Sequence, residues 1–296
     1  MAAVHLFFNL IGTVVFLVGF YAANAIVSFD FMGNVVNPAN IAIIHSIFNI
    51  FSTALLLPFC RQLEKLANII VKDQPEKKVQ DETLTLLDER FLETPSVATA
   101  QCKKVAAKMA QLSRDSIMAA INLITDYDED KVNYVNLLES KIDRYEDTLS
   151  EYIVKLERQD LSNNDNTTLS AILHNVGDLE RISDHAKNIS ESAQELHGKN
   201  LRFSPEAERE VGVYTAAVKE IVNRAVDSFI EEDVQKAADV EPLEQVIDEI
   251  HLEVKNRHIE RLRKGICTVE LGFILSDLGT NLERVADHCS NLAICT

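Results

Sequence analysis

The sequence predicts an all-α protein in which two N-terminal transmembrane helices precede a duplicated three-helix bundle. Three observations support this fold class. Residues 1–60 contain a single charged side chain, Asp30. From about residue 96 onward, apolar residues recur at helical spacing. A thirteen-residue motif then occurs twice in the second half of the chain. Only 9 glycines and 6 prolines occur in 296 residues, which argues against a turn-rich β protein.

The first two elements are predicted to cross a membrane. Residues 6–29 form an uncharged run of 24, and residues 41–59 form a run of 19. Both match the length needed for a hydrocarbon core of about 30 Å. A signal peptide is the alternative interpretation of the first run, but it lacks a basic N-terminal region. Because basic residues follow the second run, we expect a protein of the plasma (inner) membrane whose soluble domain is cytoplasmic.

The two runs share the pattern H-x-x-F-N, which places a histidine and an asparagine on one face of each helix. Polar groups at membrane depth need partners. Hydrogen bonding between the two helices is the simpler interpretation. The alternative is contact with further transporter helices or with a second copy in a homo-oligomer. The residues of this predicted membrane polar face are His5, Asn9, His45 and Asn49.

After a predicted linker at residues 61–95, the helical period continues to the end of the chain. Turn and capping residues divide it, among them Gly198 after one helix and Pro205 at the first turn of the next. Three helices fall in a first repeat, residues 96–200, and three in a second, residues 201–296. The predicted helices are 96–127, 131–160, 165–196, 205–234, 239–264 and 267–294.

A repeated motif indicates that these two halves are copies. The segment from Asp178 to Ser190 matches the segment from Asn281 to Ala293 at six of thirteen positions. The helix before each motif also matches, because Leu138-Glu139 and Asp143 correspond to Leu243-Glu244 and Asp248. Two copies in one order at nearly one spacing indicate duplication of a three-helix unit.

Each copy carries two E-x-x-x-D pairs on successive helices. A spacing of four places both carboxylates on one face, where like charges repel unless a cation neutralises them. Helical bundles hold transition-metal ions with carboxylates and histidines in this way, so iron, zinc and manganese are the candidates. A solvated acidic face with surface salt bridges is the alternative. The candidate ligands are Glu139, Asp143, Glu180 and Asp184 in the first copy, Glu244, Asp248, Glu283 and Asp287 in the second, and His185 and His288 as additional ligands.

Composition excludes several other classes. A net charge of −17 disfavours nucleic-acid binding, which needs a basic surface. The five cysteines form no C-x-x-C pair, so neither a zinc knuckle nor a disulfide framework is indicated, and Cys289 is predicted to be a buried packing residue. No phosphate-binding glycine loop, H-E-x-x-H or G-x-S-x-G is present. A metalloenzyme with a carboxylate-bridged metal site is an alternative, but it needs an open coordination position and a substrate pocket, and the sequence shows neither. The sequence therefore predicts a protein that is not an enzyme.

The motifs L-E-R-I-S-D-H-A-K-N-I and L-E-R-V-A-D-H-C-S-N-L resemble the signature helices of PhoU-type domains. The E-x-x-x-D pairs on the preceding helices resemble that family too, and the resemblance covers about residues 96–296. It implies a duplicated three-helix-bundle fold, metal clusters on the acidic helix faces and a regulatory role in phosphate uptake.

Residues 3–13 and 42–54 resemble the last membrane helices of bacterial sodium-dependent phosphate cotransporters, in which a PhoU-like domain follows the membrane part. In a complete transporter of that family the substrates would be sodium and phosphate. The Gln-Ser-Ser-type motifs of those transporters are missing from this sequence. We therefore expect the C-terminal hairpin and regulatory domain of a symporter, with no transport by this chain alone. A membrane-anchored signalling or adaptor protein is the alternative.

Overall fold

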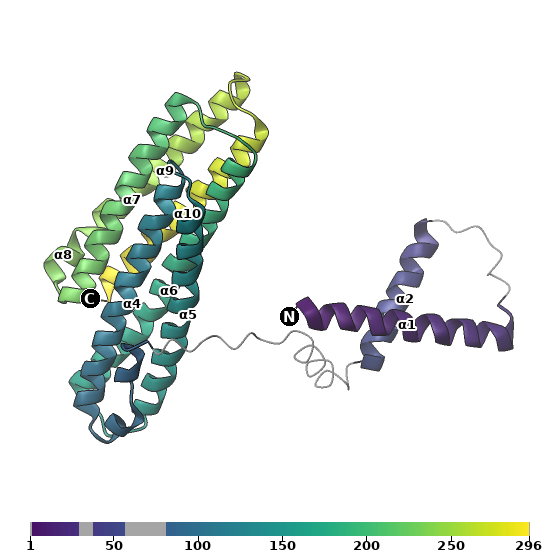
Figure 1. The fold of residues 1–296 in the computed structure, drawn as a ribbon, viewed down its shortest axis with the longest axis horizontal. Coiled ribbons are helices and arrows are strands. Elements are labelled where there is room, and N and C mark those ends of the chain that lie inside the picture. The colour runs from purple at the N-terminus through teal and green to yellow at the C-terminus, as the bar shows by residue number, and fades with distance from the viewer. Residues whose placement is uncertain (1, 30–37, 57–80, 296) are drawn as a thin grey trace. The chain divides into compact units, whose positions relative to one another are not determined.

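The computed structural model describes residues 2–29, 38–56 and 81–295 and divides the chain into two units, residues 1–79 and residues 80–296 (Figure 1). The described residues form helices and turns and contain no strand. The prediction of an all-α fold is therefore confirmed. Each unit is a separate body, and the candidate site lies in the second.

The first unit is a pair of helices, α1 (Ala2–Val27) and α2 (Pro38–Leu56). The aromatic ring of Phe16 on α1 lies 5.4 Å from that of Phe48 and 6.0 Å from that of Phe51, both on α2. In the part of the chain that the structure describes, no helix is long and apolar enough to span a membrane. The two predicted transmembrane helices therefore lack support, and the predicted location in the plasma (inner) membrane is contradicted.

The prediction rested on the absence of charged residues, and a span needs about 20 consecutive, predominantly apolar residues. Thr13 and Asn24 on α1, and His45 and Asn49 on α2, are polar. His45 and Asn49 are both exposed, four positions apart on α2. The side chains of His5 and Asn9 lie outside the described residues.

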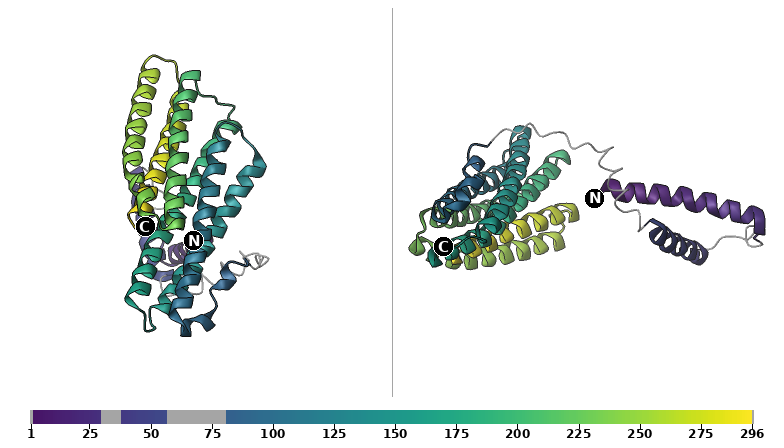
Figure 2. Two further views of the ribbon diagram at one scale, coloured as in Figure 1. Left: turned by 90° about the vertical axis from the view of Figure 1, so that its left-hand side faces the viewer. Right: turned by 90° about the horizontal axis from the view of Figure 1, so that it is seen from below.

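The second unit consists of long helices that lie side by side, as Figures 1 and 2 show from three directions. The first repeat contributes three of them and the second repeat contributes three more. Short helices connect or precede them. The bounds are η3 (Leu84–Leu86), η4 (Glu89–Glu93), α4 (Pro95–Leu123), α5 (Glu129–Leu156), α6 (Asn163–Gly198), α7 (Pro205–Glu231), α8 (Val234–Ala238), α9 (Val240–Arg263) and α10 (Val269–Ile294).

Side-chain caps mark where several of the long helices begin. The hydroxyl of Ser162 accepts a hydrogen bond from the backbone N–H of Asp165 at the start of α6, and Ser204 does the same for Ala207 at the start of α7. These caps satisfy backbone donors that have no partner within the helix. Gly265 ends α9 with a φ of 67°, a conformation that costs glycine little.

The segment before α4 packs onto the bundle. Leu84, Leu86, Leu87 and Leu92 lie partly buried against the core. The Tyr152 hydroxyl donates a hydrogen bond of 3.0 Å to the backbone carbonyl of Asp88. This segment forms the last part of the predicted linker, whose residues 61–80 lie outside the described residues.

The buried positions follow the duplication predicted from the motifs. Residues 105 positions apart correspond in α5 and α9, and residues 103 positions apart correspond in α6 and α10. In α4 and α7 the buried positions correspond at a spacing of 109, as in Ala98 with Ala207, Cys102 with Val211, Met109 with Val218 and Ile117 with Val226. One buried cluster includes residues of both repeats, and α6 packs against α10 where the repeats meet.

Candidate metal centre

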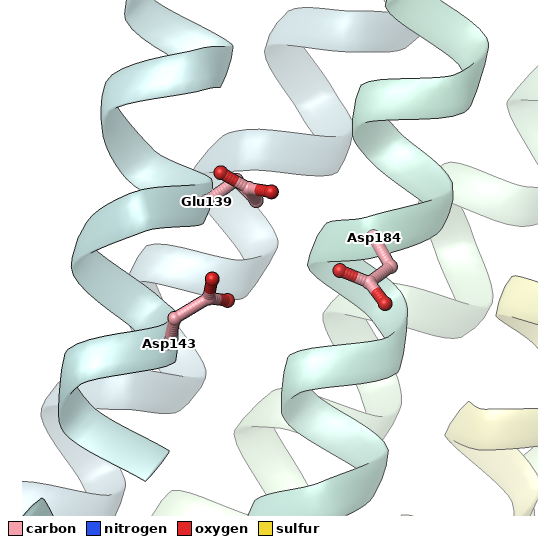
Figure 3. Close-up of side chains that lie close together, drawn as sticks. All are labelled: Glu139, Asp143 and Asp184. Carbon is pink, nitrogen blue, oxygen red and sulfur yellow. The ribbon is translucent and has the colours of Figure 1, made fainter. Parts of the chain in front are cut away.

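Three carboxylates converge on each repeat. In the first, Glu139 and Asp143 of α5 meet Asp184 of α6, and their ligand oxygens all lie within 4.8 Å of one another. Figure 3 shows the three side chains pointing toward one another across the two helices. In the second repeat, oxygens of Glu244, Asp248 and Asp287 meet the same limit. We call these groups acidic triad 1 and acidic triad 2.

The electrostatics of the triads are those of carboxylates held close together. Burial raises the pKa of Asp143, and the charges of Glu139 and Asp184 raise it further. Burial likewise raises the pKa of Glu244, with additional repulsion from Asp248 and other nearby acids. The buried Oδ1 of Asp143 has no hydrogen-bond partner among the described residues. A bound cation would remove the repulsion and fill this open position.

Glu180 and Glu283 lie beside the triads and outside them. Burial and the charge of Asp184, one turn along α6, raise the pKa of Glu180. Glu180 Oε2 lies 3.5 Å from Arg181 Nε, and Glu283 Oε2 lies 3.8 Å from Arg284 Nε. The structure therefore brings together three of the four carboxylates predicted in each copy. The ligand role of the fourth stays a prediction.

His185 and His288 face the junction between the two repeats. His185 Nδ1 lies 2.8 Å from Oδ1 of Asn281, and His288 Nδ1 lies 2.8 Å from Oδ1 of Asp178. The two rings stack with their centroids 5.6 Å apart. Within the described residues neither histidine belongs to a triad. Their geometry is that of a clamp between α6 and α10, and a ligand role for them stays a prediction.

The surroundings of the two triads differ. In triad 1, Lys187 Nζ lies 2.6 Å from Glu139 Oε1 and supplies a positive charge. The corresponding residue in the second repeat is Ser290, which donates a hydrogen bond to Glu241. Glu241 adds a further acid near triad 2 and contributes to the raised pKa of Glu244. Triad 2 is therefore the more negative of the two.

The chemistry of the donors fits a divalent transition-metal ion. Carboxylate oxygens from two facing helices can bind such an ion, and the partly buried position excludes some of the competing water. When bound, the ion would offset most of the triad's negative charge and offer open coordination positions to another molecule. The protein's part is to fix the oxygens through the packing of α5 on α6 and of α9 on α10.

Sequence reasoning missed the clamp and did not place Lys187 on Glu139. Aligning the two motifs already sets Lys187 against Ser290 and Asp178 against Asn281. Those mismatches signalled that the copies differ around a shared arrangement. The motifs alone did not show which neighbouring helix each side chain faces.

Comparison with known proteins agrees with the duplication. The family model described as the PhoU domain matches residues 106–193 and 214–296, one match in each repeat. The PhoU homolog 1, a phosphate-specific transport system accessory protein of Thermotoga maritima, is 34% identical over 121 residues. That match covers 41% of this chain and 51% of the relative, so the chain spans about half of that protein's length.

A longer match is to a protein whose name refers to phosphate transport. The Escherichia coli protein named "Putative inorganic phosphate export protein YjbB" is 20% identical over 243 residues, which cover 81% of this chain and 44% of YjbB. Among solved structures, PhoU from Pseudomonas aeruginosa superimposes with a TM-score of 0.62 at 23% identity, over 66% of this chain and 93% of that one. At this identity the superposition shows the fold.

Proposed function

Because the chain belongs to the PhoU domain family, we propose that it regulates a phosphate transporter, and that metal ions on acidic triads 1 and 2 set its regulatory state. The family match supports the coarser statement, a regulatory or accessory domain of phosphate transport that is not an enzyme. The duplicated triads are the observation that carries the finer statement.

Iron, zinc and manganese are the proposed metals, and an all-carboxylate triad between bundle helices favours manganese or iron among them. A metal bound by three side chains retains open positions, and an acceptor group on the transporter would complete its coordination. Binding and release of the transporter would then depend on metal occupancy. In this proposal phosphate moves through the partner protein and the chain changes the partner's rate.

We propose a sodium-dependent phosphate cotransporter as the partner class. Two observations support it: the sequence resemblance of residues 3–13 and 42–54 to that family, and the long match with YjbB, whose name refers to phosphate export. The proposal is tested by co-producing the chain with such a transporter and measuring sodium-dependent phosphate uptake. We expect uptake to change when the chain is present, and an unchanged rate would refute this partner class.

The metal is tested by elemental analysis of the purified chain. We expect stoichiometric metal in the native protein and loss of metal in a variant with Asp143→Asn, Asp184→Asn, Asp248→Asn and Asp287→Asn. The matched control carries Asp115→Asn and Asp160→Asn, which neutralise exposed acids outside the candidate ligand set. The control should keep its metal. If the triad variant retains as much metal as the native protein, the triads are solvated acidic faces.

A further inference from the structure

A second polar site lies between the start of α7 and the end of α9, away from both triads. A hollow of about 700 Å³ opens there, and its lining includes four basic side chains: Arg209, Arg257, Arg261 and Lys264. We call it the Arg261 hollow. Four cations around one hollow stand out in a chain whose net charge is −17.

Arg261 is the unusual member of this group. Its residue is 6% exposed, and its Nη1 contacts both carboxylate oxygens of Glu210, at 2.9 Å and 2.8 Å. Its Nε and Nη2 are buried and have no hydrogen-bond partner among the described residues. Buried donors without a partner are costly, particularly on a charged group. A guanidinium whose remaining N–H groups lie on one edge suits the two oxygens of an oxyanion.

The basic side chains of the hollow differ in how closely they are paired. Arg257 Nε lies 2.7 Å from Glu253, and its Nη1 lies 3.7 Å from Glu210. The exposed Lys264 pairs loosely with Glu260 at 3.6 Å. Arg209 donates from Nε to the backbone carbonyl of Pro205 and makes no ion pair with any described carboxylate. Glu206 completes the acidic lining, so four basic side chains face three acidic ones.

The first repeat shows that the fold does not require this buried ion pair. The position of Arg261 corresponds to Leu156, which is fully buried, and the position of Glu210 corresponds to Gln101. Replacing a buried ion pair by apolar residues is often neutral or stabilising. The first repeat packs with leucine at this position. Packing therefore does not explain the presence of Arg261 and Glu210 in the second repeat.

We propose that the Arg261 hollow binds a phosphate group through Arg261, with Arg209 and Arg257 at its rim. The volume lies within the usual range for small-molecule pockets and exceeds what one free phosphate ion fills. Val213 and Ile266 also line the hollow and are 61% and 59% exposed, so they offer apolar surface to a larger ligand. Inorganic phosphate and a nucleotide share the required chemistry. This site goes beyond the proposed function and does not depend on metal at the triads.

The test is isothermal titration calorimetry of the full chain with inorganic phosphate and, separately, with ATP, at constant ionic strength. The decisive variant is Glu210→Gln with Arg261→Leu, which installs the residues of the first repeat and leaves the net charge unchanged. The matched control is Glu220→Gln with Arg224→Leu, which removes an exposed ion pair of 2.7 Å elsewhere on α7. Circular dichroism checks that both variants fold.

We expect the native chain and the control to bind alike and the decisive variant to bind at least about 10-fold more weakly. Because Arg209 is exposed, Arg209→Gln offers a variant that leaves the core intact, and it should weaken binding about 3-fold. Binding of phosphate identifies the free ion as the ligand, and binding of ATP alone identifies a nucleotide. Absence of saturable binding by either probe, or equal binding by the decisive variant, would overturn the proposal.

Discussion

The two repeats hold the same three carboxylates in different electrostatic surroundings. Triad 1 has Lys187 on Glu139, whereas triad 2 has Ser290 at the matching position and Glu241 nearby. The two halves of the clamp differ in charge as well. His288 hydrogen-bonds to the carboxylate of Asp178, whereas His185 hydrogen-bonds to the neutral amide of Asn281. Duplication preserved the geometry of the carboxylates, and substitutions next to them changed the charge. We therefore expect two metal sites of one shape and unequal affinity, with triad 2 the tighter.

The largest expected effect comes from exchanging the residues that make the triads unequal. Lys187→Ser removes the competing ammonium group and should tighten metal binding at triad 1 about 10-fold, which corresponds to about 1.4 kcal/mol. Ser290→Lys should weaken triad 2 to a similar degree. The measurement is competition with a metal-binding dye, starting from the metal-free chain.

Lys219→Ser is the control for that exchange, because it removes an equal charge from α7, where Lys219 donates to Asn122. It should leave both affinities within about twofold of the native values. Equal metal affinities at the two triads in the native chain would show that the charges next to the carboxylates do not make the sites unequal.

A smaller effect is expected at the clamp. Burial alone would raise the pKa of Asp178, but hydrogen bonds from His288 and Asn291 bring it below its ordinary value. A depressed pKa means that the ionised form stabilises the fold above the unfolded pKa and that this contribution disappears as pH falls through the folded pKa. Asp178→Asn should therefore lower the free energy of unfolding by about 1 kcal/mol at pH 7.

Urea denaturation at pH 7 and near pH 2 measures that difference, which should shrink at the lower pH. Asn281→Asp, made in the same way, would place a carboxylate on both sides of the clamp. A loss at Asp178→Asn that stays constant with pH would show that packing, and not charge, accounts for the effect.

The smallest effect is expected within triad 1. Burial and neighbouring acids raise the pKa of Asp143, so its ionised form destabilises the metal-free fold. Stability of the metal-free chain should therefore fall as pH rises from the unfolded pKa through the raised folded value. Asp143→Asn should be more stable than the native chain at pH 7 by about 0.5 kcal/mol without metal.

With saturating metal the order of these two stabilities should reverse, because the variant lacks a ligand. The exposed Asp115→Asn on α4 controls for the general loss of a negative charge. If Asp143→Asn is less stable than the native chain without metal, the carboxylate contributes a contact that outweighs the repulsion.

Local sequence signals were sufficient to predict the helices and the duplication. Gly198 and Pro205 mark helix ends because of their backbone preferences, and the structure ends α6 and begins α7 at those residues. The E-x-x-x-D spacing placed Glu139 and Asp143 on one face of α5. The choice of Asp184 over Glu180 depended on how far α6 is rotated toward α5, which spacing along one helix does not determine.

The histidines show the same limit. His185 follows Asp184 directly, and one residue along a helix turns the side chain by about 100°. It therefore points at α10 while its neighbour points at α5. The Arg261 hollow could not be predicted from the sequence in the same way, because a single arginine does not indicate a site. Its match with the buried Leu156 shows that Arg261 occupies a core position.

The core that runs through both repeats has a consequence for a chain with one copy. Such a chain would expose the face of α6 that now packs against α10, which includes Asp178 and His185. Two such chains could cover those faces by a twofold, self-complementary contact. In this sense the present chain is a symmetric dimer joined by the loop between α6 and α7. Because both copies belong to one chain, a residue in one copy can change while its counterpart stays the same. Asp178 and the corresponding Asn281 differ in this way.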